Sequence, residues 1–443
     1  MDNKRKAVAR IPNRVAGPPR LTTNSEVATM RLVSSMTSVP VPKVLDWSDD
    51  SSNSTGTEYI IMEFVEGVRL TERWNTMSTL ERLECTETLS NFLADMTHID
   101  FTAYGSLYFI DSPLQDFPKL PYRNDYFIGA QCSAEYWKCG VGDLESLGDS
   151  VPNPGPWREI SSFCNGLIDT ALSRIPTGEY PDRAAFRGSA EDAFQLLEAA
   201  RSVIKELIKD TRVVEGASPV LIHPDFHARN VFVASNEPTK VIGVIDWQGA
   251  RIEPAFMSAL DTPDFATVLG ALPFLAVDDE RERKAADICA TAFDAIMRGS
   301  TLKFRAARRL DEIMIRIFQY CVPAWTTGAT ALRQELIDLS REWTKLKLPG
   351  TCPYVPTDEE ISLHEKLFVD LEDATKLKSG IVHLLNANGD GYVQNRYWKE
   401  AETLLPELRR QWIESATQCG TSEDEAKKIF PFEGNESIVS NGA

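Results

Sequence analysis

The sequence lacks a hydrophobic run long enough to cross a lipid bilayer. Its longest nearly uncharged apolar stretch, residues 266–277, has 12 residues, whereas a membrane-spanning helix needs about 20. Basic residues are also scarce, with 47 Lys and Arg against 65 Asp and Glu and a formal net charge of −18. Such a surface repels nucleic-acid backbones and anionic lipids. We therefore expect no membrane span and no nucleic-acid partner, and favour small molecules, metals or proteins as partners.

Cysteine pairs of the CxxC type are absent as well. The eight cysteines are scattered and show no Cys/His spacing suited to zinc, so we expect reduced, intracellular and mostly buried thiols. The first residues are basic, but the apolar segment of a secretory signal does not follow them. Pro12 would interrupt the amphipathic helix of a mitochondrial presequence.

The chain has 443 residues, of which 43% are hydrophobic, enough for one large domain or for two lobes that share a cleft. Apolar periodicity predicts a mixed α/β fold that begins with a strand-helix-strand-strand unit ending near Gly67 and continues mainly as helices. The predicted strands are residues 6–11, 41–47, 59–64, 219–222 and 241–245. The predicted helices are residues 23–36, 78–99, 191–209, 282–297, 302–318, 331–346, 357–377 and 393–414, the second with a capping box of Ser78 and Glu81.

Two other segments carry weaker signals. Residues 100–160 are rich in Gly, Pro, Tyr and Trp and predict long ordered loops with short elements, and the last 20 or so residues predict a frayed tail. Residues 386–391 resemble the first half of a calcium-binding EF-hand loop, but the twelfth position is Tyr397 instead of a bidentate Glu. We interpret this segment as a glycine-rich turn between C-terminal helices.

One dense cluster of chemically active residues stands out, although Walker, GxSxG and nucleotide-binding GxGxxG motifs are absent. Two of the five histidines fall within the loop 221–233, which reads LIHPDFHARNVFV. The pattern is His223, Asp225 and Asn230, followed after an apolar strand by Asp246. This spacing suits phosphoryl transfer, which needs a carboxylate to accept the proton of the attacking hydroxyl and oxygen ligands for Mg²⁺.

Each residue of this cluster can be given a role on that hypothesis. Asp225 would be the catalytic base, and Asn230 with Asp246 would be the metal ligands. His223 would brace the loop, whereas His227 could contact the substrate or satisfy loop carbonyls. The alternative is structural, because Asp and Asn between two strands often serve the turn itself. A His/Asp metal hydrolase is disfavoured, since the remaining histidines show no ligand spacing.

The sequence resembles the aminoglycoside phosphotransferase and choline kinase superfamily, and within it the fungal branch that includes the altered inheritance of mitochondria proteins. The resemblance rests on the loop above and on ARIP, SEVATM, VPVP, YIIMEFVEG, GSLYF and GPW at residues 9–12, 25–30, 39–42, 59–67, 105–109 and 155–157. These motifs follow one another in order, and the resemblance runs from near residue 7 to about residue 412. It implies a protein kinase-like two-lobed α+β fold with a large, mainly helical C-lobe.

The resemblance also implies roles for residues outside the loop. Arg10 stands where kinases have the strand lysine that holds the nucleotide phosphates, and Glu26 stands where the helix glutamate pairs with it. Glu63 to Val65 match the hinge, whose carbonyl and amide bind adenine. His227 occupies the position of the loop lysine of protein kinases, as in the small-molecule branch. The resemblance thus implies an ATP- and Mg²⁺-dependent kinase, in the mitochondrion or the cytoplasm, that phosphorylates a small hydroxyl-bearing substrate; the net negative charge favours a cationic one.

One departure from the family pattern concerns the start of the chain. Kinase-like folds place two strands and a phosphate-covering turn before the strand with the lysine or arginine, and only nine residues precede Arg10. We therefore expect a truncated N-lobe, residues 1–66, with the hinge at its end, and a C-lobe, residues 67–443, with the catalytic loop at 221–247. A pseudokinase-like binding or regulatory protein without catalysis remains the alternative. A protein kinase is less favoured, because no activation segment ends in Ala-Pro-Glu.

Overall fold

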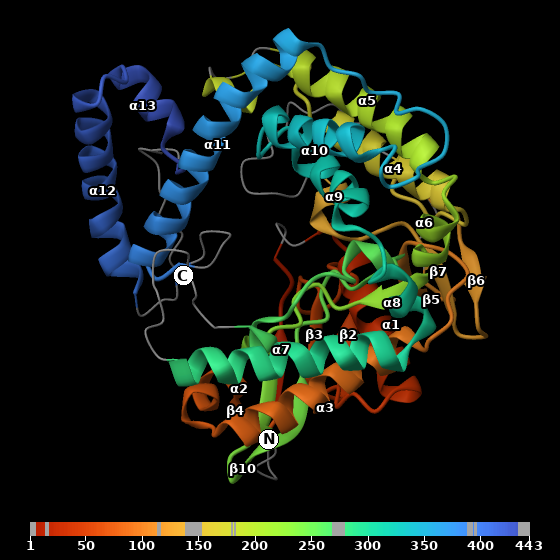
Figure 1. Ribbon diagram of the computed structural model, residues 1–443. Coiled ribbons are helices and arrows are strands. Elements are labelled where there is room, and N and C mark those ends of the chain that lie inside the picture. Colours follow the sequence, from red (N-terminus) through yellow and green to blue (C-terminus); the bar gives the residue numbers. More distant parts are fainter. Residues whose placement is uncertain are drawn as a thin grey trace.

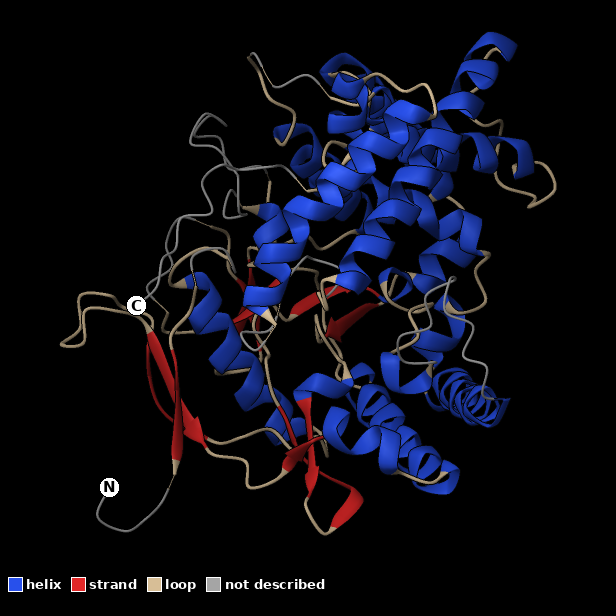
Figure 2. Cartoon of the chain, turned by 90° about the vertical axis from the view of Figure 1, so that its left-hand side faces the viewer, coloured by secondary structure: helices blue, strands red, loops and turns tan. Residues whose placement is uncertain are grey.

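The structure, a computed structural model, describes residues 6–13, 17–112, 117–137, 153–178, 180, 183–267, 280–387, 393 and 397–432. Within these ranges the chain combines small antiparallel sheets with many helices (Figure 1). Most helices lie to one side of the strands when the molecule is turned by 90° (Figure 2). The expected α+β class with a large helical C-terminal part is confirmed.

The strands form four small antiparallel sheets with the orders β1-β3-β2, β10-β9-β4, β11-β8 and β5-β7-β6. Their bounds are β1 (Ala7–Arg10), β2 (Val44–Ser48), β3 (Tyr59–Glu63), β4 (Val68–Arg69), β5 (Ser106–Phe109), β6 (Leu120–Tyr122), β7 (Tyr126–Gly129), β8 (Pro219–Ile222), β9 (Val231–Ala234), β10 (Glu237–Val244) and β11 (Arg251–Pro254). All five predicted strands are present.

The helices are mostly capped by side chains of the kind that sequence rules favour. Their bounds are α1 (Leu21–Met36), α2 (Leu70–Arg73), α3 (Thr79–Thr97), α4 (Ile160–Ser173), α5 (Ala190–Leu207), α6 (Thr211–Gly216), α7 (Glu280–Ser300), α8 (Leu302–Ala307), α9 (Glu312–Cys321), α10 (Ala329–Glu342), α11 (Asp358–Leu384), α12 (Trp398–Gln418) and α13 (Glu423–Ile429). The capping box of Ser78 and Glu81 at the start of α3 is confirmed. A helical part of this size needs such caps because each helix leaves four amide groups unsatisfied at its start.

The predicted strand-helix-strand-strand unit is formed by β1, α1, β2 and β3. In it, β3 pairs with β1 on one side, with Arg10 opposite Ile60, and with β2 on the other. Helix α1 is buried over most of its length because it lies between this sheet and β5. A carboxylate from outside the helix binds at its first turn. Glu58 accepts hydrogen bonds from the Arg20 amide at 2.9 Å and from the Thr23 hydroxyl at 2.6 Å. A negative charge at a helix N-terminus is favourable, so this contact fixes where α1 begins.

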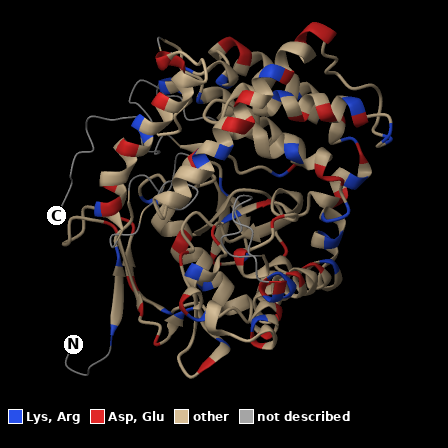
Figure 3. Cartoon of the chain, turned by 60° about the vertical axis from the view of Figure 1, so that its left-hand side comes forward, with Lys and Arg blue, Asp and Glu red and all other residues tan. Residues whose placement is uncertain are grey.

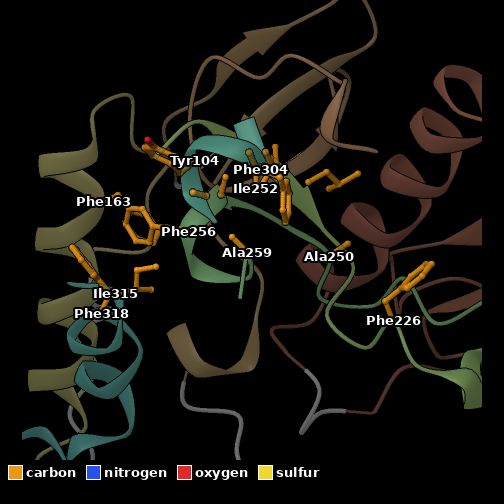
Figure 4. Packing of buried hydrophobic residues seen from close by; sticks show 14 of the residues in the cluster. Tyr104, Phe163, Phe226, Ala250, Ile252, Phe256, Ala259, Phe304, Ile315 and Phe318 are labelled. Carbon is orange, nitrogen blue, oxygen red and sulfur yellow. The ribbon is translucent and has the colours of Figure 1, made fainter. Parts of the chain in front are cut away.

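The main hydrophobic core joins this unit to the helical part. Figure 4 shows Phe256, which follows β11, near Phe163 of α4 and Phe318 of α9 within this core. The Phe256 and Phe318 rings are 4.7 Å apart between centroids, and both are fully buried. Burial of aromatic side chains of this size contributes roughly 2–3 kcal/mol each. The paired strands β8 and β11, which lie before and after the candidate loop and its β9–β10 hairpin, are therefore held rigidly.

A separate hydrophobic cluster joins α11, α12 and α13 at the outer end of the helical part (Figure 1). Phe430 is 4% exposed at its centre, and the Trp412 indole donates a hydrogen bond of 2.9 Å to the carbonyl of Ala426. The prediction of a frayed tail over the last 20 or so residues was therefore wrong for α13. Ser422 caps that helix, and the apolar side of α12 covers it. The EF-hand-like segment lies largely outside the described residues.

One further prediction needs correction. The helix expected at residues 302–318 is two helices, α8 and α9, because the chain turns after Ala307 and Asp311 caps a new helix. The segment 100–160, expected to hold long ordered loops with short elements, contains the short strands β5, β6 and β7, which form a three-stranded sheet. In the ranges described above, a helix that is both apolar and long enough to span a bilayer is not found. The cysteines in those ranges are free, and most are buried as expected.

Candidate active site

The loop between β8 and β9 is organised around the side chain of His223. This imidazole is 5% exposed and packs edge-to-face against Trp247 at 4.7 Å. Its Nδ1 accepts a hydrogen bond of 3.1 Å from the amide of Asp225, so its Nε2 carries the proton and donates to the carbonyl of Ile245, also at 3.1 Å. Burial lowers the pKa of His223 to about 4. A neutral imidazole therefore ties the loop to the end of β10.

A second hydrogen bond holds Ile245, this time through its backbone amide. The amide of Ile245 donates to the carbonyl of Asn230 at 3.0 Å. Both polar groups of Ile245 are thus held by the β8–β9 loop, and the next residue, Asp246, is placed beside it. Asp246 has a φ of 68°, a left-handed conformation that is uncommon for residues other than Gly, Asn and Asp. The turn therefore directs the Asp246 carboxylate away from the path of the strand.

Asp225 and Asn230 are brought together as the sequence pattern predicts. The Asn230 side-chain amide donates to the Asp225 carboxylate at 2.6 Å and to the Asp225 carbonyl at 2.9 Å. A short turn of 3-10 helix, Ala228–Asn230, brings the chain back over these five residues. Arg229, which is half exposed, donates to both carboxylate oxygens of Asp225, at 2.9 and 2.7 Å. Three donor groups therefore hold the Asp225 carboxylate in one orientation.

His227 lies between two carboxylates. Its Nε2 is 3.5 Å from Asp225 and its Nδ1 is 3.5 Å from Asp264, distances of electrostatic contact rather than of good hydrogen bonds. The carboxylate of Asp264 raises the pKa of His227 against the effect of partial burial. Asp264 also accepts a hydrogen bond of 2.9 Å from the Ala228 amide. Asp264 thus connects the loop to the segment that follows β11.

Arg10 joins three parts of the chain. Its guanidinium donates to Asp246 at 2.7 Å through Nη2 and also contacts Glu26 and Gln248. The Arg10 and Glu26 pair is the one that the resemblance implies, and Asp246 lies 236 residues further along the chain. Glu26 is 3% exposed, and burial raises its pKa to about 7, although Arg10 opposes this shift. Strand β1, helix α1 and the end of β10 therefore meet at the Arg10 guanidinium.

Glu63 and Val65, the residues predicted to form the hinge, lie where β3 ends, and Gly243 of β10 packs against Val65. A Cβ built on Gly243 would lie 2.8 Å from a Val65 methyl group, so only glycine permits this approach. The amide of Glu63 is used within the sheet, donating to Lys43 at 2.9 Å. The Val65 amide, by contrast, donates to no backbone carbonyl in the part of the chain that the structure describes.

The residues present fit a magnesium ion. Two side-chain oxygens, Asn230 Oδ1 and Asp246 Oδ2, accept no hydrogen bond from any described residue. No group of three or more His, Cys, Asp or Glu side chains in the described ranges is arranged to hold a metal ion. Mg²⁺ commonly takes only one or two protein oxygens and completes its shell with phosphates and water. Asn230 and Asp246 are therefore the pair that could hold it.

Three residues of the site were missed by reasoning from the sequence: Arg229, Gln248 and Asp264. Arg229 lies inside the quoted loop, and its spacing of four residues from Asp225 could have indicated an ion pair. Gln248 follows Asp246 by two residues, but its contact with Arg10 depends on the whole fold. Asp264 lies beyond β11 and carries no local signal.

Comparison with known proteins identifies the class. Residues 1–286 match the family model described as the phosphotransferase enzyme family, APH. Because that match covers most of the chain, the protein belongs to this family, whose kinase-like fold was expected from the resemblance.

The individual proteins that match this chain have low sequence identity to it. The chain is 26% identical over 472 residues to a subtelomeric hrmA-associated cluster protein of Aspergillus fumigatus, covering 95% of this chain and 91% of that protein. It is 23% identical over 317 residues to the mitochondrial altered inheritance of mitochondria protein 9 of Candida glabrata, covering 59% of this chain but 48% of that protein. This second relative is of the fungal branch expected from the sequence.

Among solved structures, the gentamicin complex of APH(2'')-IIa aligns with 80% of this chain and 88% of its own, with 14% identity and a TM-score of 0.34. A thermostable mutant of the aminoglycoside phosphotransferase APH(4)-Ia aligns with 77% of this chain and 88% of its own, with 14% identity and a TM-score of 0.35.

Proposed function

We propose that this protein is an ATP- and Mg²⁺-dependent phosphotransferase that transfers the γ-phosphoryl group to the hydroxyl of a small molecule. The observation that carries the proposal is the Arg10 guanidinium, which contacts Glu26 and Asp246 at once. Phosphoryl transfer depends mainly on positioning and electrostatic stabilisation. An arrangement in which one cation contacts two carboxylates, and in which the residue before Asp246 is bonded to Asn230, supplies both.

The side chains would divide the work as follows. Asp225 would accept the proton of the acceptor hydroxyl, and the Asn230 amide would keep its carboxylate oriented. Arg10 would bind the nucleotide phosphates through the parallel N–H groups of its guanidinium, and Glu26 would hold that guanidinium in place. Asn230 and Asp246 would hold Mg²⁺, which neutralises phosphate charge when bound. His223 would support the loop, and His227 would lie beside the acceptor.

The nucleotide base would lie at the hinge. The free amide of Val65 and the carbonyl of Glu63 would bind adenine through the backbone. Sheet membership changes at this point, since β3 pairs with β1 and β2 whereas β4 pairs with β9. This change supports a division into lobes at residues 1–66 and 67–443.

Two further parts of the proposal concern the acceptor and the place of action. The net charge of −18 and the acidic pair around His227 favour a cationic acceptor. Relatives named as mitochondrial support the mitochondrion, with the cytoplasm as the alternative, and fractionation of cells that express a C-terminally tagged chain decides between them.

A binding or regulatory protein without catalysis is the second candidate. The observation that favours it is the engagement of both Asp225 oxygens by Arg229. A carboxylate held by this fork has fewer lone pairs left to accept a substrate proton.

The decisive experiment measures ADP release from ATP and Mg²⁺, with water and a panel of hydroxyl-bearing amines as acceptors. Asp225→Asn should lower turnover about 100-fold or more while the nucleotide-induced rise in melting temperature persists. Asp246→Ala should remove the Mg²⁺-dependent part of that rise. Asp370→Asn, an exposed site on α11, is the matched control and should change neither.

The outcomes separate the two candidates. A melting shift with no turnover in the wild type supports the binding protein. Full activity of Asp225→Asn refutes the assigned base. A nucleotide shift that Asp246→Ala leaves unchanged refutes the metal assignment.

A further inference from the structure

Two adjoining hollows lie on the side of the molecule formed by α6 and α8. The larger, of about 670 Å³, is lined by Arg212, Lys303, Arg305 and Arg309, with Glu215 as its one acidic residue. The smaller, of about 380 Å³, shares Arg305 and Arg309 with it and adds Arg298. The volumes are in the range of small-molecule sites, roughly 300–1,000 Å³.

The charge of these hollows is opposite to that of the protein. The whole chain carries a net charge of −18, with acidic and basic residues interspersed along its helices (Figure 3). The larger hollow nevertheless presents four cationic side chains and one carboxylate, and the smaller presents cations without a carboxylate among its described lining residues. Clustered cations repel one another, which is unfavourable, so this cluster calls for an interaction that compensates the repulsion.

Part of this charge is already neutralised within the fold. Arg212 pairs with Asp210 at 2.7 Å, Lys303 with Asp100 at 2.9 Å and Arg298 with Asp294 at 2.7 Å. These three cations therefore have structural partners.

The two arginines that both hollows share have no carboxylate partner among the described residues. Arg305 donates to the carbonyls of Arg298 and Gly299 at the end of α7, at 2.8 and 2.9 Å. For the Arg309 side chain, no hydrogen bond or ion pair to any described residue is present. The Arg309 guanidinium and the remaining N–H groups of Arg305 are therefore the donors left to bind an anion.

The walls of the larger hollow are rigid. Gly216, the last residue of α6, lies so close to α8 that a Cβ there would be 2.7 Å from a Leu310 methyl and 3.3 Å from the backbone of Ala307. Leu310 is 6% exposed and joins the main core. The arginines of α8 and the residues after it are thus presented from a packed surface instead of a mobile loop.

The hollow is distinct from the candidate active site. Ser218 lines it and directly precedes β8, whereas His223 directly follows β8. A strand of four residues spans about 13 Å. The hollow and the catalytic loop therefore lie at opposite ends of the same buried strand.

We propose that these hollows form a site for a small molecule that carries two linked phosphate groups. Planar guanidinium groups match the oxygens of phosphate in bidentate fashion. Two guanidinium groups shared between two adjoining hollows can each receive one phosphate, while Arg298 lies on one side and Arg212 with Lys303 on the other. Such a ligand supplies the negative charge that the described carboxylates do not provide to Arg305 and Arg309.

The test is titration calorimetry of the full chain with pyrophosphate, without Mg²⁺ or nucleotide. We expect one molecule to bind at the hollows of each chain. Arg309→Ala should weaken the dissociation constant about tenfold or more, because a charge-assisted pair is lost, and Arg309→Lys should weaken it less. Lys240→Ala, which removes one exposed positive charge from β10, is the matched control and should change it less than twofold. Inorganic phosphate should bind more weakly than pyrophosphate.

Arg10→Ala separates this site from the candidate nucleotide site, since pyrophosphate could also bind there. Binding that survives Arg10→Ala and falls in Arg309→Ala supports the proposal. Loss of binding in Arg10→Ala with retention in Arg309→Ala refutes it, as does an equal loss in Lys240→Ala or the absence of binding at millimolar pyrophosphate. Equal affinity for phosphate and pyrophosphate refutes the two-phosphate ligand. A melting curve of each variant excludes misfolding as the cause.

Discussion

Acidification below pH 6.5 is expected to destabilise the protein through His223. The imidazole is buried, and its two nitrogens are committed to one acceptor and one donor role, toward the Asp225 amide and the Ile245 carbonyl. A second proton on the ring would break the first of these bonds and would place a charge in the core. The folded state therefore resists protonation of this residue, whereas the unfolded state does not.

The magnitude follows from the difference in pKa between the two states. The pKa of His223 falls from an ordinary 6.5 to about 4 in the folded protein, and one pKa unit corresponds to about 1.4 kcal/mol. Because the folded pKa is depressed, the stabilisation is fully present above pH 6.5 and is lost as the pH falls toward 4. The expected loss is about 3 kcal/mol, a large share of the stability of an ordinary domain.

The assay is urea unfolding at several pH values between 4 and 8, for the wild type and for His223→Asn. An asparagine side chain can keep an acceptor near the position of Nδ1 but cannot titrate in this range. The difference in unfolding free energy between the two proteins should therefore change by about 3 kcal/mol between pH 8 and pH 4, in favour of the variant at low pH. Other titrating groups cancel in this difference. A difference that stays constant across this range would refute the buried, neutral imidazole.

The remaining predictions concern Glu26, the hinge and the C-terminal helices. The raised pKa of Glu26 keeps a proton on the folded state but not on the unfolded state, so the wild type should lose about 3 kcal/mol of stability as the pH rises from 4.5 to 7. Glu26→Gln should abolish this loss. An unfolding free energy that changes equally with pH in both proteins, measured by urea unfolding, would contradict this. Gly243→Ala should destabilise by about 1–3 kcal/mol, and Val65→Ala in the same chain should recover most of the loss, measured by thermal unfolding; an unimproved double variant would contradict the contact. Phe430→Ala should cost about 3 kcal/mol and expose α13 to proteolysis, and an unchanged cleavage pattern would count against its packing.

The local part of the candidate site could be predicted from the sequence. Four residues separate Asp225 from Asn230, and a loop of that length between two strands has few ways to return, so their side chains meet. The loop's dependence on His223 could likewise be expected, since a buried loop must satisfy its own amides. These contacts arise within one short segment, and their geometry is set by the spacing.

Contacts between distant segments could not be predicted with the same precision. The bond between Arg10 and Asp246 depends on how the β1-β3-β2 sheet sits against the end of β10. That arrangement is set by the backbone bond from Val244 to Pro40, at 2.8 Å, and by the packing of Gly243 on Val65. Neither contact has a pattern in the sequence, because each joins segments that are far apart along the chain.

The position of Arg10 explains why these distant contacts matter to the candidate site. One nitrogen of its guanidinium faces Glu26 on α1, and the other faces Asp246 at the end of β10. A lysine presents a single ammonium and cannot span two carboxylates on different elements with the same fixed geometry. With Glu26 near its pKa at neutral pH, the charge of Arg10 is balanced chiefly by Asp246. The cation that would meet nucleotide phosphates is therefore held by the same carboxylate that would hold the metal, so the two binding events cannot be independent.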